Sequence, residues 1–459
     1  MLKGVQKFLR MGLILYKQEF GQTRGGTFKK ATIVNLLGRV VAGFVSLISV
    51  RLSIAYLTSE GFGILTTITS VTGWLTLTNL GFGIGLQNLL IDAVAKGDLE
   101  RERKLVSTTQ IVLGLVCFVI LVGWSVLFQL SLISWNQLLN VSSPKYVDEV
   151  SRAVFWSGVI VLVLVYTSYV QAIYAANQKL HRFGLWQIFS QLCSLLGLVL
   201  ASVSHAPLAG AVLAIYGMPA GIMLLNSVWL GIRHPDRYLP RISNFSLPDL
   251  KQLLKFGGSF TLIGITGILQ YGTDNLIISN VLGSSYVTSY TIVMKLFNFF
   301  QSLMGSQLMP MWVALANAKS SGDWHWIRRQ FSRVRNLTLA VNFVFFIGMV
   351  LLGQFVIHLW IGPSVQVSLT LITLVGFYAL ARAWADLHSI LCNALDQAPI
   401  SAILGVLAGV ITVVIMYFSA SHWGLNGMVM SEGLTMLLMA GLALPYIAYR
   451  ALNRLESHV

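Results

Sequence analysis

The sequence is divided into long apolar blocks separated by short polar segments, and this division restricts the possible folds more than any other feature. Each block has about 20 to 25 residues, the length at which an α-helix crosses the hydrocarbon core of a bilayer. Only 10% of the residues are charged and 56% are hydrophobic, whereas a soluble chain carries about 25% charged residues. The pattern predicts an all-α polytopic membrane protein.

The polar breaks define twelve predicted transmembrane helices. They are expected at residues 33–57, 62–90, 107–130, 153–176, 183–203, 208–230, 253–281, 287–315, 337–360, 367–395, 400–419 and 424–449. The connections on one side are very short, apart from residues 131–152. No external domain is therefore expected in which hydrolytic or polymerising chemistry would take place.

The positions of the basic residues orient the spans. Twenty-five of the 31 Lys and Arg residues fall in segments on the side of the N-terminus, two fall on the opposite side, and four lie inside spans. Because positive residues collect on the cytoplasmic side of a membrane, both termini are predicted to be cytoplasmic. The formal net charge of +15 is accordingly interpreted as a topology signal, and no nucleic-acid partner is expected.

The first 32 residues are predicted to form a cytoplasmic basic amphipathic segment. Lys3, Lys7, Arg10 and Lys17 fall on one side of a helical wheel, opposite a set of apolar residues. Such a helix lies on the anionic inner leaflet of a membrane. The alternative is a solvated basic tail. A basic start without an uninterrupted apolar stretch and a cleavage site is not typical of a signal peptide.

The second half of the chain matches the first half when it is shifted by 225 residues. The matched residues occupy equivalent topological positions: Leu57 and Leu282, Ser59 and Ser284, Thr66 and Thr291, Gly97-Asp98 and Gly322-Asp323, Arg103 and Arg328, Trp135 and Trp360. Each half has six spans, so the repeats are parallel, an arrangement found in transporters with a central site. The predicted domains are an N-terminal lobe (33–231), a cytoplasmic linker (232–252), a C-terminal lobe (253–449) and a cytoplasmic tail (450–459).

No motif for catalysis, a cofactor or a metal is found in the sequence. Metal-ligand pairs, a nucleophile motif, a phosphate-binding loop and a dinucleotide fingerprint are all missing. The three cysteines, Cys117, Cys193 and Cys392, lie within apolar stretches and have no ligand or disulfide spacing. The chain is therefore predicted not to be an enzyme.

Several motifs resemble those of the Wzx-type O-antigen and exopolysaccharide flippases, the polysaccharide transporters of the multidrug/oligosaccharidyl-lipid/polysaccharide superfamily. In the first half they are residues 56–63 (YLTSEGFG), residues 74–85 (WLTLTNLGFGIG) and Gly97-Asp98. In the second half they are residues 274–283 (DNLIISNVLG), residues 290–296 (YTIVMKL) and Pro310. The resemblance implies a V-shaped pair of six-helix lobes that moves undecaprenyl-pyrophosphate-linked oligosaccharide from the cytoplasmic to the periplasmic leaflet of the bacterial inner membrane. The resemblance also implies a polysaccharide polymerase and a chain-length regulator as candidate partners.

Four basic residues lie inside the predicted spans: Arg39, Arg51, Lys295 and Arg382. A pyrophosphate-headed substrate requires cationic donors, and ionisable residues in a membrane usually face a cavity or each other. Arg39 and Arg51 point about 120° apart and have the alternative of snorkelling to an interface. Lys295 has the alternative of an ion pair with Asp274. Arg382 has the alternative of pairing with Asp386 one helical turn away.

The intramembrane carboxyl groups are candidates for coupling or ion pairing. They are Asp274, Asp386 and Glu432. A carboxyl group in a span can carry a proton, and transport would then be coupled to a proton gradient, with sodium as the other candidate ion. The alternative is that these groups satisfy nearby hydroxyls and amides.

A cation-coupled multidrug antiporter of the same superfamily is the competing function. It would share the two-lobe fold, but its cavity should be acidic to attract organic cations. In this sequence four intramembrane basic residues accompany a comparable number of acids. This balance favours an anionic substrate.

Overall fold

The computed structural model describes residues 25–305 and 308–457, and every regular element in those residues is helical. In the first half the helices are α2 (Gly25–Gly73), α3 (Phe82–Lys96), α4 (Leu99–Gln129), α5 (Trp135–Leu138), α6 (Pro144–Thr167), α7 (Tyr169–Ala176), α8 (Leu180–Val203), α9 (Leu208–Val212) and α10 (Met218–Arg233). After α11 (Pro235–Tyr238), the second half contains α12 (Leu247–Tyr271), α13 (Asp274–Leu282), α14 (Ser284–Gly305), α15 (Leu308–Ser320), α16 (Trp324–Ile361), α17 (Leu369–Ala394), α18 (Ala398–Thr435) and α19 (Gly441–Ser457).

Within the described residues, eight helices are long and apolar enough to cross a membrane, or nine if a bent pair at 247–258 and 260–282 is one span. Two of the eight, Leu37–Lys96 and Ala398–Ser457, have 60 residues each, a length of about 90 Å. Non-helical backbone at Thr58 and Gly424 breaks these two segments. A polytopic all-α membrane protein is thereby confirmed, and the total of twelve spans stays a prediction.

The helices extend further into the polar connecting segments than the apolar blocks do. α4 begins at Leu99 and α16 at Trp324, although their apolar blocks begin at 107 and 337. The side chain of Asp98 accepts a hydrogen bond from the Arg101 backbone at the start of α4, and Asp323 does the same for α16. These aspartate N-caps satisfy free backbone donors, so each helix starts before its hydrophobic section.

Paired local features recur in the two halves at about the same spacing as the sequence repeat. Gly97 and Gly322 both have left-handed backbone, with φ of 69° and 73°. The turns at Thr58 and Gly283 both have positive φ. Single π-helical segments occur at Leu213–Gly217 and Met436–Ala440. These are the features that a duplication by 225 residues would produce.

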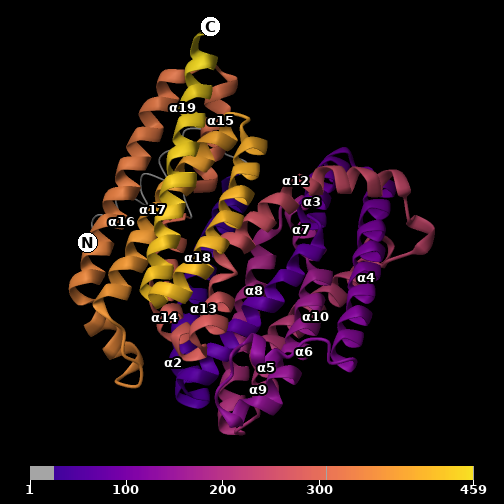
Figure 1. Ribbon diagram of the computed structural model, residues 1–459. Helices are drawn as coiled ribbons and strands as arrows, with labels where there is room; N and C mark the ends of the chain where they lie inside the picture. The colour runs from indigo at the N-terminus through magenta and orange to yellow at the C-terminus, as the bar shows by residue number, and fades with distance from the viewer. Residues whose placement is uncertain (1–24, 306–307, 458–459) are drawn as a thin grey trace.

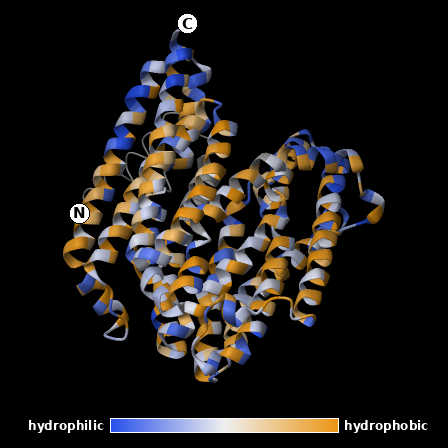
Figure 2. Cartoon of the chain, viewed as in Figure 1, coloured by the Kyte–Doolittle hydropathy of each residue, from blue (hydrophilic) through white to orange (hydrophobic). Residues whose placement is uncertain are grey.

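The two halves of the chain meet at one end of the molecule and diverge toward the end that carries the C-terminus (Figure 1). Helices α16 to α19 lie on one side, and α4, α6 and α10 lie on the other. Hydrophobic residues cover most of the helices, while hydrophilic residues gather at the diverging ends (Figure 2). This distribution agrees with the basic side of the sequence lying at the open end.

Helices of one half contact helices of the other along two seams. α2 runs beside α14, and α3 runs beside α12. At the end opposite the C-terminus, Ser279 and Ser284 donate hydrogen bonds to the Leu139 carbonyl, at 2.6 and 3.1 Å. Thr288 donates to the Ser59 carbonyl at 2.5 Å. The halves are therefore sealed at this end.

The predicted linker is folded against the first half of the chain. The Tyr238 hydroxyl donates to Glu102 at 2.9 Å, and Gln110 donates to the Tyr238 carbonyl at 2.9 Å. Burial, together with the neighbouring Glu102 carboxylate, raises the pKa of Tyr238 to about 12. The linker is therefore a docked segment that ends where α12 begins.

Most of the predicted basic amphipathic segment, residues 1–24 of 1–32, lies outside the described residues. The described part begins as helix at Gly25, eight residues before the predicted first span.

Candidate functional site

The seam between α2 and α14 carries two of the predicted basic residues. Arg39 on α2 donates a hydrogen bond from Nη1 to the Ser302 carbonyl of α14 at 2.8 Å. Lys295 on α14 donates from Nζ to Ser46 Oγ of α2 at 3.0 Å. These contacts run in opposite directions between the helices, so each half supplies a cation to the same seam.

A third basic residue reaches the same face of α14. Lys295, Asn298 and Ser302 are spaced i, i+3 and i+7, which places them on one side of a helix. Arg382 on α17 donates from Nη1 to Asn298 Oδ1 at 3.2 Å. Arg39, Lys295 and Arg382 thus converge on one stripe of α14, which we call the basic seam.

Arg382 is also paired within its own helix. Its Nε lies 3.7 Å from Asp386 Oδ2, and the two side chains are 24% and 41% exposed. The alternative of an internal Arg382–Asp386 pair is therefore present in the structure, together with the contact to α14. Arg382 contacts both α14 and its own helix, α17, because its guanidinium has donors that point in different directions.

Arg51 is not brought to the basic seam. It lies on α2, twelve residues beyond Arg39, and so points about 120° away from it. Its side chain is exposed. Arg51 as a substrate-binding residue therefore stays a prediction, separate from the other three cations.

A cluster of carboxyl and phenol groups is buried beside the basic seam. The Tyr290 hydroxyl of α14 lies 2.8 Å from Asp274 Oδ2 and 3.3 Å from Glu432 Oε2. Asp274 and Glu432 are 4% and 1% exposed. Tyr378 of α17 contacts Glu432, and the charge of Arg382 acts on both carboxyl groups. Elements distant in the sequence therefore bring together two of the three predicted coupling residues.

The alternative of an ion pair between Asp274 and Lys295 is not found among the ion pairs of the described residues. Asp274 accepts from Tyr290, whereas Lys295 donates across the seam to Ser46. The two residues lie at similar depth, as their sequence positions imply, but their side chains leave their helices toward different neighbours. Depth is readable from residue number, while side-chain direction depends on how α13 and α14 pack.

Tyr290, Tyr378 and Asn298 were not identified as site residues from the sequence. Their only sequence signal was a polar group inside an apolar block, which is common in membrane helices. Tyr290 lay within a motif that carried the family resemblance, but nothing in that motif indicates that its hydroxyl joins two carboxyl groups.

The second seam, between α3 and α12, contains a cavity of about 500 Å³. The predicted span 62–90 is interrupted in this region by a 3-10 segment, Trp74–Asn79, followed by left-handed backbone at Leu80 and Gly81. Irregular backbone at membrane depth is tolerated only where it is buried in protein or lines a water-filled space. The break in this span is accordingly found at the wall of the cavity.

Glycines permit the close approach of the two helices at this seam. Gly81 has a φ of 71°, and a Cβ there would lie 2.1 Å from the Gly257 carbonyl oxygen. A Cβ on Gly85 would lie 2.8 Å from the Leu253 carbonyl oxygen. Any larger residue at Gly81 would therefore displace α12, and the cavity depends on these positions.

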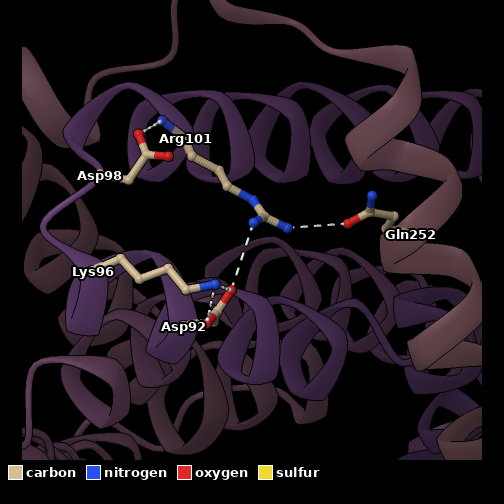
Figure 3. Close-up of polar contacts among 5 residues, drawn as sticks. All are labelled: Asp92, Lys96, Asp98, Arg101 and Gln252. Carbon is tan, nitrogen blue, oxygen red and sulfur yellow. Dashed lines mark hydrogen bonds and ion pairs between the residues drawn. The ribbon is translucent and has the colours of Figure 1, made fainter.

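Near the α3–α4 turn, the second seam is joined by a polar contact (Figure 3). Arg101 of α4 reaches toward α12, where its Nη2 donates to Gln252 Oε1 at 3.3 Å. Its Nη1 also lies 3.6 Å from Asp92 Oδ2, and Asp92 pairs with Lys96 at 2.9 Å. This contact connects the α3–α4 turn to the start of the second half.

Comparison with known proteins identifies first the fold and then the family. The helices superpose on an inward-facing multidrug resistance MATE family transporter of the MOP superfamily with a TM-score of 0.78, at 14% identity and covering 93% of this chain and 99% of that one. An outward-facing conformation of such a transporter gives a TM-score of 0.66, at 13% identity and covering 94% and 96%. The fold is therefore that of MOP-type transporters, and its helices are arranged more like the inward-facing form.

The family model described as "Polysaccharide biosynthesis protein" matches residues 55–369. The chain belongs to this family, and the resemblance to Wzx-type flippases is thereby confirmed. A Salmonella typhi protein named for O-antigen transport is 23% identical, over 87% of this chain and 91% of its own length. A Yersinia pseudotuberculosis protein named for O-antigen export is 22% identical, over 91% and 94%. These relatives carry the names of transporters, as the non-enzymatic prediction requires.

Proposed function

We propose that this protein is a flippase that moves undecaprenyl-pyrophosphate-linked oligosaccharide from the cytoplasmic to the periplasmic leaflet of the bacterial inner membrane by alternating access. The product would be used for O-antigen, capsule or exopolysaccharide synthesis, beside a polymerase and a chain-length regulator. The basic seam is the observation that carries the proposal. Three cations from α2, α14 and α17 converge there, and cations are the groups that bind pyrophosphate.

The cations of the basic seam would accompany the anionic head while the polyprenyl tail stays in lipid. Arg39 and Asn298 are exposed, and Lys295 and Arg382 are partly exposed. Charged side chains at membrane depth rarely face lipid, so their exposed surfaces are expected to face the opening between the halves. Both termini would be cytoplasmic, and the two lobes would be residues 33–231 and 253–449.

Proton exchange at the carboxyl cluster would couple transport to a gradient. Two buried negative charges that share one tyrosine hydroxyl repel each other, so adding or removing one proton changes the interaction of α13 with α18. Arg382 contacts Asn298 of the basic seam and acts electrostatically on the cluster. This residue would connect substrate binding to the protonation state.

The test replaces Arg39, Lys295 and Arg382 one at a time by Ala, and by the other basic residue, in a strain that lacks its own copy. Loss of one charge-assisted hydrogen bond costs about 1.5 to 3 kcal/mol, so each Ala variant is expected to reduce surface polysaccharide by about tenfold or more. The Lys and Arg swaps should recover part of the activity. Arg51→Ala is the matched control, expected to retain polysaccharide at equal membrane levels.

Normal polysaccharide in all three Ala variants would contradict the proposal. The competing multidrug antiporter makes a different prediction for deletion of the gene. Polysaccharide would then remain intact and the cells would become sensitive to cationic drugs. The MATE neighbours share only the fold with this chain, so this outcome has to be measured.

A further inference from the structure

Among the residues that the structure describes, the wall of the cavity in the second seam contains no charged side chain. Its polar lining consists of amides and hydroxyls from α3, α7, α12 and the 3-10 segment Trp74–Asn79. Ser168, in the turn before α7, contributes a further hydroxyl. The polar members are Thr76, Asn79, Gln87, Ser168, Gln171 and Thr261. The basic seam and this neutral cavity therefore offer different chemistry at the two contacts between the halves.

Several of these polar groups are not used to hold the fold together. The Asn79 side-chain oxygen accepts from the Gly83 backbone at 3.3 Å, which leaves its amide nitrogen for another partner. The Ser168 hydroxyl oxygen is buried without a hydrogen-bond partner. The side-chain amides of Gln87, which is partly exposed, and of Gln171, which is exposed, make no hydrogen bond with other described residues and are accessible to a ligand. Unpaired polar groups are costly in a membrane unless water or a ligand satisfies them.

The chemistry of the wall selects a neutral, hydroxyl-rich ligand. Side-chain amides and hydroxyls both donate and accept hydrogen bonds, and sugar hydroxyl groups do the same. A cation would lack a carboxylate in this wall, and a pyrophosphate would lack an arginine or lysine. An acyl chain would leave the amides unsatisfied. The volume of about 500 Å³ falls within the range of small-molecule sites.

We propose that this neutral cavity, with Asn79, Gln87 and Gln171 as its hydrogen-bonding residues, receives uncharged sugar residues of the lipid-linked substrate. This inference rests on the proposed flippase function and divides the substrate between the seams. The basic seam binds the pyrophosphate, and the neutral cavity binds the sugars. Gly264 and Gly267 of α12 form part of the wall, where the lack of a side chain exposes backbone to the ligand.

The first experiment measures protection of a cysteine placed in the wall. Cys117, Cys193 and Cys392 are replaced by Ala, and Gln171→Cys is labelled with a maleimide in the full-length protein in proteoliposomes. The probes are undecaprenyl pyrophosphate bearing an oligosaccharide repeat unit and undecaprenyl pyrophosphate without sugar. Protection by the sugar-bearing lipid alone is expected. Equal protection by both lipids, or protection by neither, overturns the assignment to sugars.

The second experiment measures translocation of the sugar-bearing lipid by Gln87→Leu/Gln171→Leu. Losing two neutral hydrogen bonds is expected to slow translocation by about tenfold, while Gln129→Leu, at the exposed end of α4, retains the rate. An unchanged rate in the double variant overturns the inference and leaves the flippase function standing. Failure of the wild-type protein to move either lipid, with normal polysaccharide in the deletion strain, overturns both.

Discussion

At the scale of single residues, one tyrosine hydroxyl in the buried cluster lies within hydrogen-bond distance of two carboxyl groups. Tyr290 contacts both Asp274 and Glu432, and the second oxygen of each carboxyl group is buried without a hydrogen-bond partner. Replacing a member of such a network lowers the stability of the protein most when a buried polar group is left without a hydrogen-bond partner. The consequence of a substitution therefore depends on whether the new side chain keeps the hydrogen bonds or removes them.

Glu432→Gln is expected to keep the stability of the protein, whereas Glu432→Ala is expected to lose about 1 to 3 kcal/mol. The amide preserves the shape and a hydrogen bond to the tyrosine hydroxyl, and alanine removes both. The measurement is thermal unfolding of the purified variants in detergent. If Gln and Ala destabilise equally, the charge of Glu432 rather than its hydrogen bonding supports the fold.

At the scale of elements, the sequence predicted most of the helices but not the break in the predicted span 62–90. The apolar blocks predicted most helices, because burial in lipid imposes a length and a composition that can be read locally. The interruption at Trp74–Asn79 was not predicted, because its polar residues, Thr76, Thr78 and Asn79, are of types that also occur in continuous membrane helices. The break depends on Gly81 and on the close approach of α12, a contact between distant parts of the chain.

Tyr238→Phe is expected to loosen the linker. The variant removes the hydrogen bond to Glu102, whose carboxylate is 2% exposed, and the one donated by Asn177. Leaving such a buried acceptor without a hydrogen-bond donor costs about 1 to 3 kcal/mol of stability. Limited trypsin digestion should cut faster at Arg237 and Arg241. Tyr286→Phe, at a tyrosine that is 50% exposed, is the control and should be digested like the wild type.

The same contact is expected to weaken at alkaline pH. Because burial raises the pKa of Tyr238 to about 12 from an ordinary value of 10.0, the neutral hydroxyl stabilises the fold fully below pH 10.0. That contribution is lost as the pH rises toward 12. The difference in melting temperature between the wild type and Tyr238→Phe should therefore be larger at pH 8 than at pH 11. A constant difference would contradict this account.

At the scale of the whole molecule, the contacts describe a protein that is closed at one end. The halves are joined at Thr288 and Ser59 and at the loop around Leu139, while they diverge toward the C-terminus (Figure 1). A close approach supports the seal, since a Cβ on Gly63 would lie 1.8 Å from the Ser284 carbonyl oxygen. Alternating access requires these contacts to separate.

Cross-linking Ser59→Cys to Thr288→Cys with a short thiol-specific reagent is expected to abolish translocation, and reduction of the cross-link should restore it. The physical reason is that the reagent holds the sealed end closed. A matched cross-link between Thr412→Cys and Thr435→Cys, whose hydroxyl groups are 3.1 Å apart within the second half, should leave the rate unchanged if each half moves as a rigid body. Translocation through the Ser59–Thr288 cross-link would exclude opening at this end.

The sequence alone determined the membrane class, the basic side, the family and the identity of the intramembrane charges. These properties follow from composition and from patterns within about twenty-five residues, the length of one span. Only the tertiary structure decided which charges meet. Arg39 reaches Ser302 and Lys295 reaches Ser46 across more than half of the chain, while Arg51 points elsewhere. Helix packing sets these partners, since a residue's depth is local but the direction of its side chain depends on which helices surround it.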